Sequence, residues 1–383
     1  MRTLFLKMVF IFAGAMSRKL LIIILLVFPG IRAKGQDTLA HRWSVNAGIH
    51  TGFLVAHRPM IVPLQQRHIT GFETNLVMNP GGSKLWHRVY GFPEMGLSFL
   101  IWDLGNEEQL GTAYSLIPYL NFPLTKGKKT QINLKFGWGV GYIEKRFNAD
   151  NNHKNIAIGS HLNYALILQP QIKTRITDRL HLNGGFSIAH FSNGSVATPN
   201  LGINVASITT GLSYNFGQPV IRKTDPLPPF IKSNRFSMFA AISMKQVYPA
   251  DGKNYFACTV SGNQSWQISR KSAFGFGTDI FYDNSISQKL EERNRELNNS
   301  LEALRIGIHG GYEMVISDFS LVLNFGGYLY SKLQNDGTFY QRIGLRYRLS
   351  EKIFVAMHLK AHWGKADYIE WGVGYRIDKF KSK

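Results

Sequence analysis

The sequence is poor in cysteine and in acidic residues, and beyond its N-terminus it has no long apolar run. Of its 383 residues only Cys258 is a cysteine, so no internal disulfide can form and no cysteine-based metal site is predicted. No segment after residue 35 is apolar over the ~20 residues that a membrane-spanning helix requires. These shortages exclude a disulfide-stapled scaffold and a helical membrane protein.

Acidic residues are outnumbered, since 24 Asp and Glu stand against 44 Lys and Arg, for a net charge of +20. Such a balance suits an anionic partner. For an exported chain we expect that partner to be anionic lipid or phosphorylated glycolipid and not nucleic acid. The alternative is that the basic residues line turns, loops and a wet barrel interior.

Export is predicted by the N-terminal segment "MSRKLLIIILLVFPGIRAKGQ", which begins at Met16. It has a basic start, an apolar run over residues 20–28, and small residues at the −3 and −1 positions of a cut before Gln36. The apolar run is too short to span a bilayer. We therefore assign residues 1–35 to a signal peptide and exclude them from the fold.

The mature chain alternates apolar and polar residues in segments separated by turns. In "QINLKFGWGVGYIEK", residues 131–145, every second residue is large and apolar, and glycines fill the opposite face: Phe136, Trp138, Val140 and Tyr142 against Gly137, Gly139 and Gly141. A membrane barrel turns such a face to lipid and keeps small or polar residues inside. We therefore predict an all-β protein, an antiparallel outer-membrane β-barrel.

About eight such segments precede residue 217 and about eight follow residue 234, near 43–53, 70–78, 91–102, 113–122, 131–145, 159–173, 179–192 and 203–216, and near 235–247, 254–267, 272–283, 303–316, 318–331, 338–349, 352–363 and 367–377. The segment 217–234 between them is rich in proline, which forbids a central strand. We predict a barrel over 36–216, a linker over 217–234 and a C-terminal barrel half over 235–383. Two eight-stranded units and one barrel of about sixteen strands both fit, and residues 287–304 read as a helical loop.

Three polar residues fall on the lipid side of two sequential strands. His190 and Ser192 share the phase of the apolar residues in "HLNGGFSIAHFS", and Asn204 shares that of the next strand. Polar groups are costly there, so their convergence indicates a site that acts on a lipid. Ser192 needs a base, which His190 can supply, and Asn204 can orient that base through its side-chain oxygen.

Donors for an oxyanion stand in the segment that follows the serine. The candidates are Asn193, Asn200 and the backbone N–H of Gly194. A bare His-x-Ser also recurs by chance, and a polar residue at a strand end often meets only lipid headgroups.

The segment "HFSNGSVATPN" resembles the active-site region of the lipid A 3-O-deacylase (PagL-like) family, which are outer-membrane esterases with an eight-stranded barrel. His190, Phe191, Ser192 and Asn193 match the family's His-aromatic-Ser-Asn run, and 199–200 match its Pro-Asn pair. The resemblance is strong over 180–216 and extends over 43–216. Residues 235–383 are similar to the added C-terminal half of acyloxyacyl hydrolase-type relatives.

One position departs from the family, because its acid, twelve residues after the serine, is Asn204 here. An amide can orient histidine but does not stabilise imidazolium as a carboxylate does. Three outcomes are therefore open: a slower enzyme, one that uses the amide by design, and one that has lost its activity. The resemblance implies an esterase that removes an ester-linked acyl chain from lipid A, with Ser192 as nucleophile, His190 as base and no cofactor or metal. The alternatives are a non-catalytic barrel, acting as a pore or scaffold, and an outer-membrane phospholipase.

Overall fold

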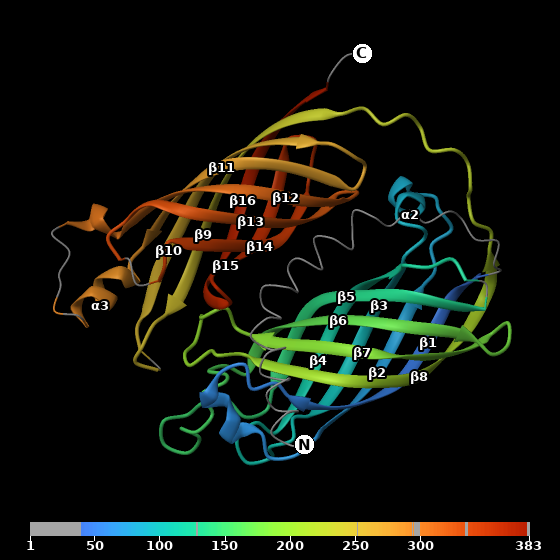
Figure 1. Ribbon diagram of the computed structural model, residues 1–383, viewed down its shortest axis with the longest axis horizontal. Helices are drawn as coiled ribbons and strands as arrows, with labels where there is room; N and C mark the ends of the chain where they lie inside the picture. Colours follow the sequence, from blue (N-terminus) through green and yellow to red (C-terminus); the bar gives the residue numbers. More distant parts are fainter. Residues whose placement is uncertain are drawn as a thin grey trace, which may run out of the picture. The chain divides into compact units, whose positions relative to one another are not determined.

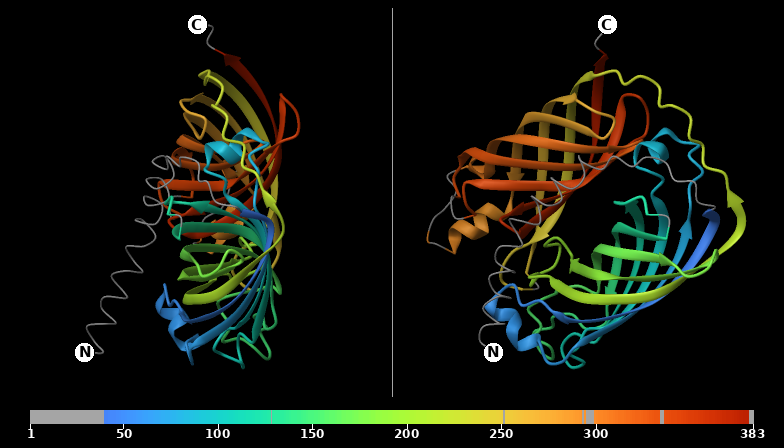
Figure 2. Two further views of the ribbon diagram at one scale, coloured as in Figure 1. Left: turned by 90° about the vertical axis from the view of Figure 1, so that its right-hand side faces the viewer. Right: turned by 45° about the vertical axis from the view of Figure 1, so that its right-hand side comes forward.

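The computed structural model describes residues 40–380 except 128, 251, 293, 295–298 and 334–335. Strands dominate it, and the chain divides into two compact units, one of which takes residues up to Leu227 without Gly194–Thr198. Those five loop residues group with the second unit, which continues from Pro228. Each unit contains one closed antiparallel barrel of eight strands (Figures 1 and 2).

The first barrel closes by pairing its first strand with its last, in the order β1 to β8. Its strands are β1 (Ala40–Leu54), β2 (Ile69–Met78), β3 (Glu94–Asp103), β4 (Thr112–Pro123), β5 (Thr130–Ile143), β6 (Leu162–Arg175), β7 (Leu180–Ser192) and β8 (Ile203–Val220). A 3₁₀ helix, η1 (Pro59–Leu64), follows β1, and a short helix, α2 (Leu85–Val89), follows β2.

The second barrel closes through β9 and β16. Its strands are β9 (Ser233–Gln246), β10 (Asn254–Gln267), β11 (Ser272–Asp283), β12 (Leu304–Ile316), β13 (Phe319–Ser331), β14 (Phe339–Arg348), β15 (Ile353–His362) and β16 (Lys365–Phe380). Between β11 and β12 lie α3 (Ser285–Glu291) and the 3₁₀ helix η2 (Ser300–Ala303).

Side chains alternate between the two faces of each strand, and the large apolar ones face outward. On β1 the outward residues Val45 and Ile49 are exposed, whereas Ser44 and His50 point inward and are buried. Aromatic side chains gather outside, as where Trp43 and Phe216 pair in register beside the barrel's two chain ends. An apolar outer face around a polar interior is the arrangement of a transmembrane barrel.

The lumen of the first barrel is polar in one part and apolar in the other. Its polar part holds buried Glu73, which binds Lys135, His50 and Ser98. The other part is a packed cluster that includes Trp102, Phe191 and residues of the β1–β2 and β5–β6 loops. An eight-stranded barrel is just wide enough for side chains to fill it, and these side chains do so.

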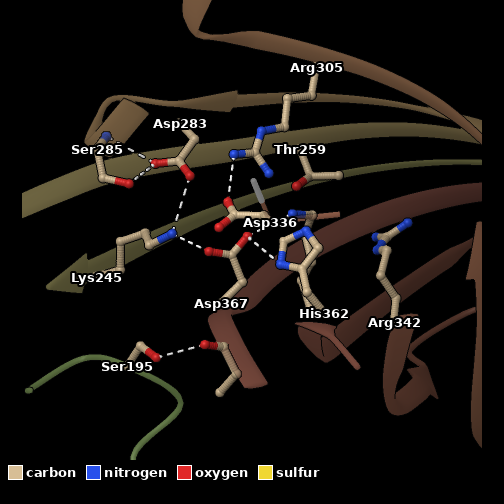
Figure 3. A network of polar contacts seen from close by, with 12 residues as sticks. Ser195, Lys245, Thr259, Asp283, Ser285, Arg305, Asp336, Arg342, His362 and Asp367 are labelled. Atoms are coloured by element: carbon tan, nitrogen blue, oxygen red, sulfur yellow. Dashed lines mark hydrogen bonds and ion pairs between the residues drawn. The ribbon is translucent and has the colours of Figure 1, made fainter. Parts of the chain in front are cut away.

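The lumen of the second barrel is crossed by buried ion pairs. At the end where β9 finishes, Asp367 pairs with Lys245 (Figure 3). Asp367 also pairs with Lys360, whose Nζ is 2.7 Å from Oδ2. Lys245 also reaches Asp283, with Nζ 3.1 Å from Oδ2. Deeper in the lumen Arg342 joins two further carboxylates, Asp279 at 2.7 Å and Glu370 at 2.8 Å. Each of these buried charges thus has a partner of opposite sign, as burial requires.

The structure decides between the two architectures left open by the sequence, because each half closes on itself and a single barrel of about sixteen strands is wrong. The proline-rich connection is shorter than predicted, since β8 continues to Val220 and β9 begins at Ser233. The predicted helical loop 287–304 is helical only in α3 and η2 among its described residues.

No helix in the described part of the chain is long and apolar enough to cross a membrane. The predicted signal peptide, 1–35, lies outside the described residues.

Candidate active site

The candidate site lies where β7 ends and β8 begins, at the barrel end opposite Ala40 and Val220. His190 is the direct cross-strand partner of Asn204 in the β7–β8 register. Directly opposed residues have Cβ atoms about 4.5–5.5 Å apart, so their side chains can meet on one face. That face is the outward one, because Leu182 and Phe186, which share the phase of His190, are 46% and 43% exposed.

His190 and Asn204 are joined by a hydrogen bond. His190 Nδ1 lies 2.7 Å from Asn204 Oδ1. An amide oxygen only accepts, so the proton is on Nδ1 and Nε2 is left as the basic nitrogen of the ring. This is the tautomer that a general base for a neighbouring serine requires.

Ser192 lies two residues beyond His190 on the same face of β7, about 6.6 Å along the strand. Its hydroxyl is held by Asn200 from the β7–β8 loop: Asn200 Nδ2 donates to Ser192 Oγ at 3.0 Å, and Oδ1 accepts from Oγ at 3.3 Å. Asn200 Oδ1 also accepts from the backbone N–H of Asn193 at 3.2 Å. The loop therefore folds back on the serine and brings an amide donor beside its oxygen.

One predicted oxyanion donor has another partner in the structure, and the backbone of a second is in the left-handed region. The buried side chain of Asn193 donates to Ser160 Oγ at 2.9 Å, which ties the β7–β8 loop to the β5–β6 loop. Gly194 has a φ of +65° and packs, within the second unit, against Ile369, where an added Cβ would lie 2.2 Å from Cδ1. The third candidate, Asn200, contacts Ser192 through its side-chain amide.

The strand ends that carry the site are anchored from the lumen side. Phe191, between His190 and Ser192, and Ile203, before Asn204, are buried in the apolar cluster. Gly202 has a φ of +83°, and a Cβ there would lie 2.8 Å from His190 Cε1. Glycine therefore serves two needs at this position, a left-handed backbone and a close approach to the imidazole.

Sequence reasoning missed His57, which lies in the loop after β1 on the far side of Asn204. Asn204 Nδ2 is 2.9 Å from His57 Nδ1, and His57 Nε2 is 3.0 Å from the carbonyl oxygen of Leu201. Nothing in the sequence pointed to this pairing, because 147 residues separate the partners and His57 follows its strand without a motif. The antiparallel closure of β1 on β8 brings the two together.

A second array of serine, histidine and carboxylate exists inside the first barrel. Ser207 Oγ lies 3.1 Å from His50 Nδ1, and His50 Nε2 lies 3.1 Å from Glu73 Oε2. All three are at most 2% exposed, and the Trp102 ring packs edge-on against His50. Glu73 also binds Lys135, so the array is part of the packing of the lumen and offers a lipid no approach.

Metal chemistry was not predicted for this chain. Within residues 40–380, apart from the gaps named above, no group of three or more His, Cys, Asp or Glu side chains is placed to hold a metal ion.

Comparison with known families gives two matches along the chain. Residues 70–213 match the family described as Lipid A 3-O-deacylase (PagL), and residues 234–379 match Acyloxyacyl hydrolase, C-terminal domain. The first match includes β2 to β7 and most of β8, with His190, Ser192 and Asn204. No curated protein matches the chain.

Two solved structures are similar to part of this chain. Neisserial surface protein A is 8% identical, covers 45% of this chain and 97% of its own, and has a TM-score of 0.33. The outer membrane enzyme PagL is 17% identical, covers 43% of this chain and 97% of its own, and has a TM-score of 0.29. Together the two family matches span well over half of the sequence, and both barrels have the outward apolar face of outer-membrane proteins. The first barrel therefore belongs to the lipid A 3-O-deacylase family and the second barrel is an acyloxyacyl hydrolase C-terminal domain, in one protein of the bacterial outer membrane.

Proposed function

We propose that this protein is an outer-membrane esterase that removes an ester-linked acyl chain from lipid A, with Ser192 as nucleophile and His190 as general base. The observation that carries the proposal is the 2.7 Å hydrogen bond from His190 to Asn204 on the lipid-facing side of the barrel. It leaves Nε2 as the basic nitrogen of a histidine that lies two residues from a serine on the same strand face, at a position where a polar group has little other reason to be.

In the proposed reaction, His190 Nε2 takes the proton of Ser192 as Oγ attacks the ester carbonyl carbon. The resulting oxyanion forms beside Oγ, where Asn200 Nδ2, now 3.0 Å from Oγ, can donate to it. His190 then returns the proton to the departing sugar hydroxyl, and a fatty acyl-serine remains. Water, activated by His190 in the same way, releases the fatty acid and restores the serine.

Asn204 holds the imidazole in place during these steps but supplies no negative charge. An imidazolium forms each time His190 accepts a proton, and a carboxylate at position 204 would stabilise it more than an amide does. The chemistry is therefore expected to be slower than with an acid at this position, with the orientation of His190 retained.

The location of the site suits a substrate that stays in the bilayer. The longest connection of the barrel, 144–161, lies at the end that carries His190, opposite the chain ends, and in transmembrane barrels the longer loops are extracellular. Lys154 is exposed in the β5–β6 loop at the same end, where it can meet lipid A phosphates. A pore is disfavoured, because inward side chains fill both lumens among the described residues.

The direct test uses the purified full-length protein in detergent with lipid A, or with a diacyl glycerophospholipid at the same mole fraction. We expect mass spectrometry to show lipid A losing one ester-linked acyl chain while its amide-linked chains remain. The phospholipid is expected to stay intact. Faster release from the phospholipid would make the protein a phospholipase, and intact lipid A would leave a non-catalytic barrel.

Asn204 variants test the orienting role. Replacing Asn204 with Ala removes the acceptor for His190 Nδ1, so we expect kcat to fall by roughly ten- to a hundredfold, with a smaller change in KM. Asn204→Asp has the same shape and adds charge, so its rate should equal or exceed that of the wild type. Initial rates of fatty-acid release, from variants that keep the heat-modifiable gel band of a folded barrel, provide the measurement. Equal rates for Ala and Asn would remove Asn204 from the mechanism.

A further inference from the structure

We propose that His57 is a positioning residue that sets the orientation of the Asn204 amide and, through it, the tautomer of His190. This inference rests on the proposed function, since it concerns the base of the same site. It follows from a chain of contacts that runs from the loop after β1 across β8 to β7.

The need for such a residue arises from the amide itself. A carboxylate presents an oxygen to its neighbour whichever way it turns, but an amide presents oxygen on one side and NH₂ on the other. If Asn204 turned over, its NH₂ would face His190 Nδ1 and demand an acceptor there. The proton of His190 would then move to Nε2, and Nε2 could no longer act as a base.

His57 opposes that turn because it offers an acceptor to the NH₂ group. Its Nδ1 lies 2.9 Å from Asn204 Nδ2, so it must be unprotonated to receive that hydrogen. With Nδ2 satisfied on this side, Oδ1 is left facing His190 at 2.7 Å. The orientation of one amide thus depends on which nitrogen of His57 carries the proton.

The backbone fixes that tautomer in turn. His57 Nε2 lies 3.0 Å from the carbonyl oxygen of Leu201, which can only accept, so the proton belongs on Nε2. His57 Nδ1 also lies 3.3 Å from the carbonyl oxygen of Val55, a longer contact. The loop is held against β8 by a 2.8 Å bond from the backbone N–H of Val55 to the carbonyl of Asn204. The imidazole of His57 is therefore held in place by these hydrogen bonds, although the residue is exposed.

This arrangement offsets the family difference at position 204. Where the acid would orient the histidine unaided, this chain has an amide together with a second histidine that gives the amide a direction. Asn204 and His57 should therefore be energetically coupled. The loss of rate on removing His57 should depend on which residue occupies position 204.

The experiment is a double-mutant cycle on full-length protein, with release of fatty acid from lipid A as the readout. With Asn204 present, His57→Ala is expected to lower kcat by roughly tenfold, because one orienting hydrogen bond is lost. KM should stay within about twofold of the wild-type value. In the Asn204→Asp background, the same change should alter kcat by less than about twofold, because either carboxylate oxygen serves. His57→Asn should restore most of the activity, since its side-chain oxygen sits where Nδ1 was.

His153→Ala is the matched control, since it removes an exposed histidine from the β5–β6 loop. If His57 served only the stability of its loop, His57→Ala would lower activity equally in the Asn204 and Asn204→Asp proteins, and His57→Asn would not restore it. An equal loss in the two backgrounds, or a failure of His57→Asn to restore activity, overturns the inference. If Ser192→Ala is inactive while His57→Ala matches the wild type, the His57 role fails and the proposed reaction stands. If Ser192→Ala matches the wild type, the proposed reaction itself fails.

Discussion

Replacing Ser192 with Ala should lower the release of fatty acid from lipid A by roughly 10³-fold or more, the scale on which removal of a serine nucleophile acts in hydrolases. The barrel should remain intact, because Ser192 sits at the end of β7 and its side-chain bonds to Asn200 are half-buried. Unfolding free energy should change by about 1 kcal/mol or less. Fatty-acid release per mole of folded protein, judged by the heat-modifiable band, is the measurement.

The matched control for Ser192 is Ser207→Ala. It also removes a hydroxyl that contacts a histidine, here His50 Nδ1 at 3.1 Å, but on the lumen side of β8. We expect this variant to retain its activity. An active Ser192→Ala with an inactive Ser207→Ala would place the chemistry in the lumen at His50 and Glu73 and contradict the outward site.

Asp367→Asn should be among the most destabilising single changes in the second barrel. Asp367 neutralises two buried ammonium groups, those of Lys245 and Lys360, which are 1% and 0% exposed. An amide of the same shape leaves Lys360 without its carboxylate partner, while Lys245 keeps Asp283 at 3.1 Å. Breaking a buried pair from one side costs about 3–5 kcal/mol. Urea unfolding in lipid vesicles, followed by tryptophan fluorescence, should show the loss.

The comparison for Asp367 is Asp318→Asn in the turn between β12 and β13 of the same barrel. Asp318 lies 2.6 Å from Arg348, and their side chains are 47% and 38% exposed, so the pair is worth about 1 kcal/mol or less. Similar losses from the two variants would mean that water reaches Lys245 and Lys360, and that the second lumen is wetter than its packing indicates.

Strand positions were predictable because apolar and polar residues alternate along a strand whose two faces meet different surroundings. The expected strands at 254–267 and 272–283 coincide with β10 and β11, and the segment 131–145 became β5 within two residues of its ends. Which strands pair to close a barrel was harder to predict. Sixteen strands show the same alternation of apolar and polar residues whether they form one barrel or two. The helix α2 was missed because a five-residue helix in a loop carries no periodic signal.

The outward phase of His190 and Asn204 followed from counting residues along two strands, and the structure places their side chains together as the β7–β8 register requires. The apolar packing around Phe191 was not predicted, because the barrel interior was expected to hold small or polar residues. His57 was beyond prediction for a different reason. Its partner is brought to it by the closure of β1 on β8, a pairing that no local pattern records.

The outward direction of His190 and Ser192 has a consequence for the kinetics of the proposed enzyme. A site on the lipid-facing wall meets its substrate by diffusion within a two-dimensional film, so the concentration that matters is the mole fraction of lipid A in that film. Added detergent or inert lipid slows such an enzyme by surface dilution even when the bulk amount of lipid A is constant. Catalytic constants for this barrel are therefore properties of the enzyme and its membrane together, and their natural unit is mole fraction.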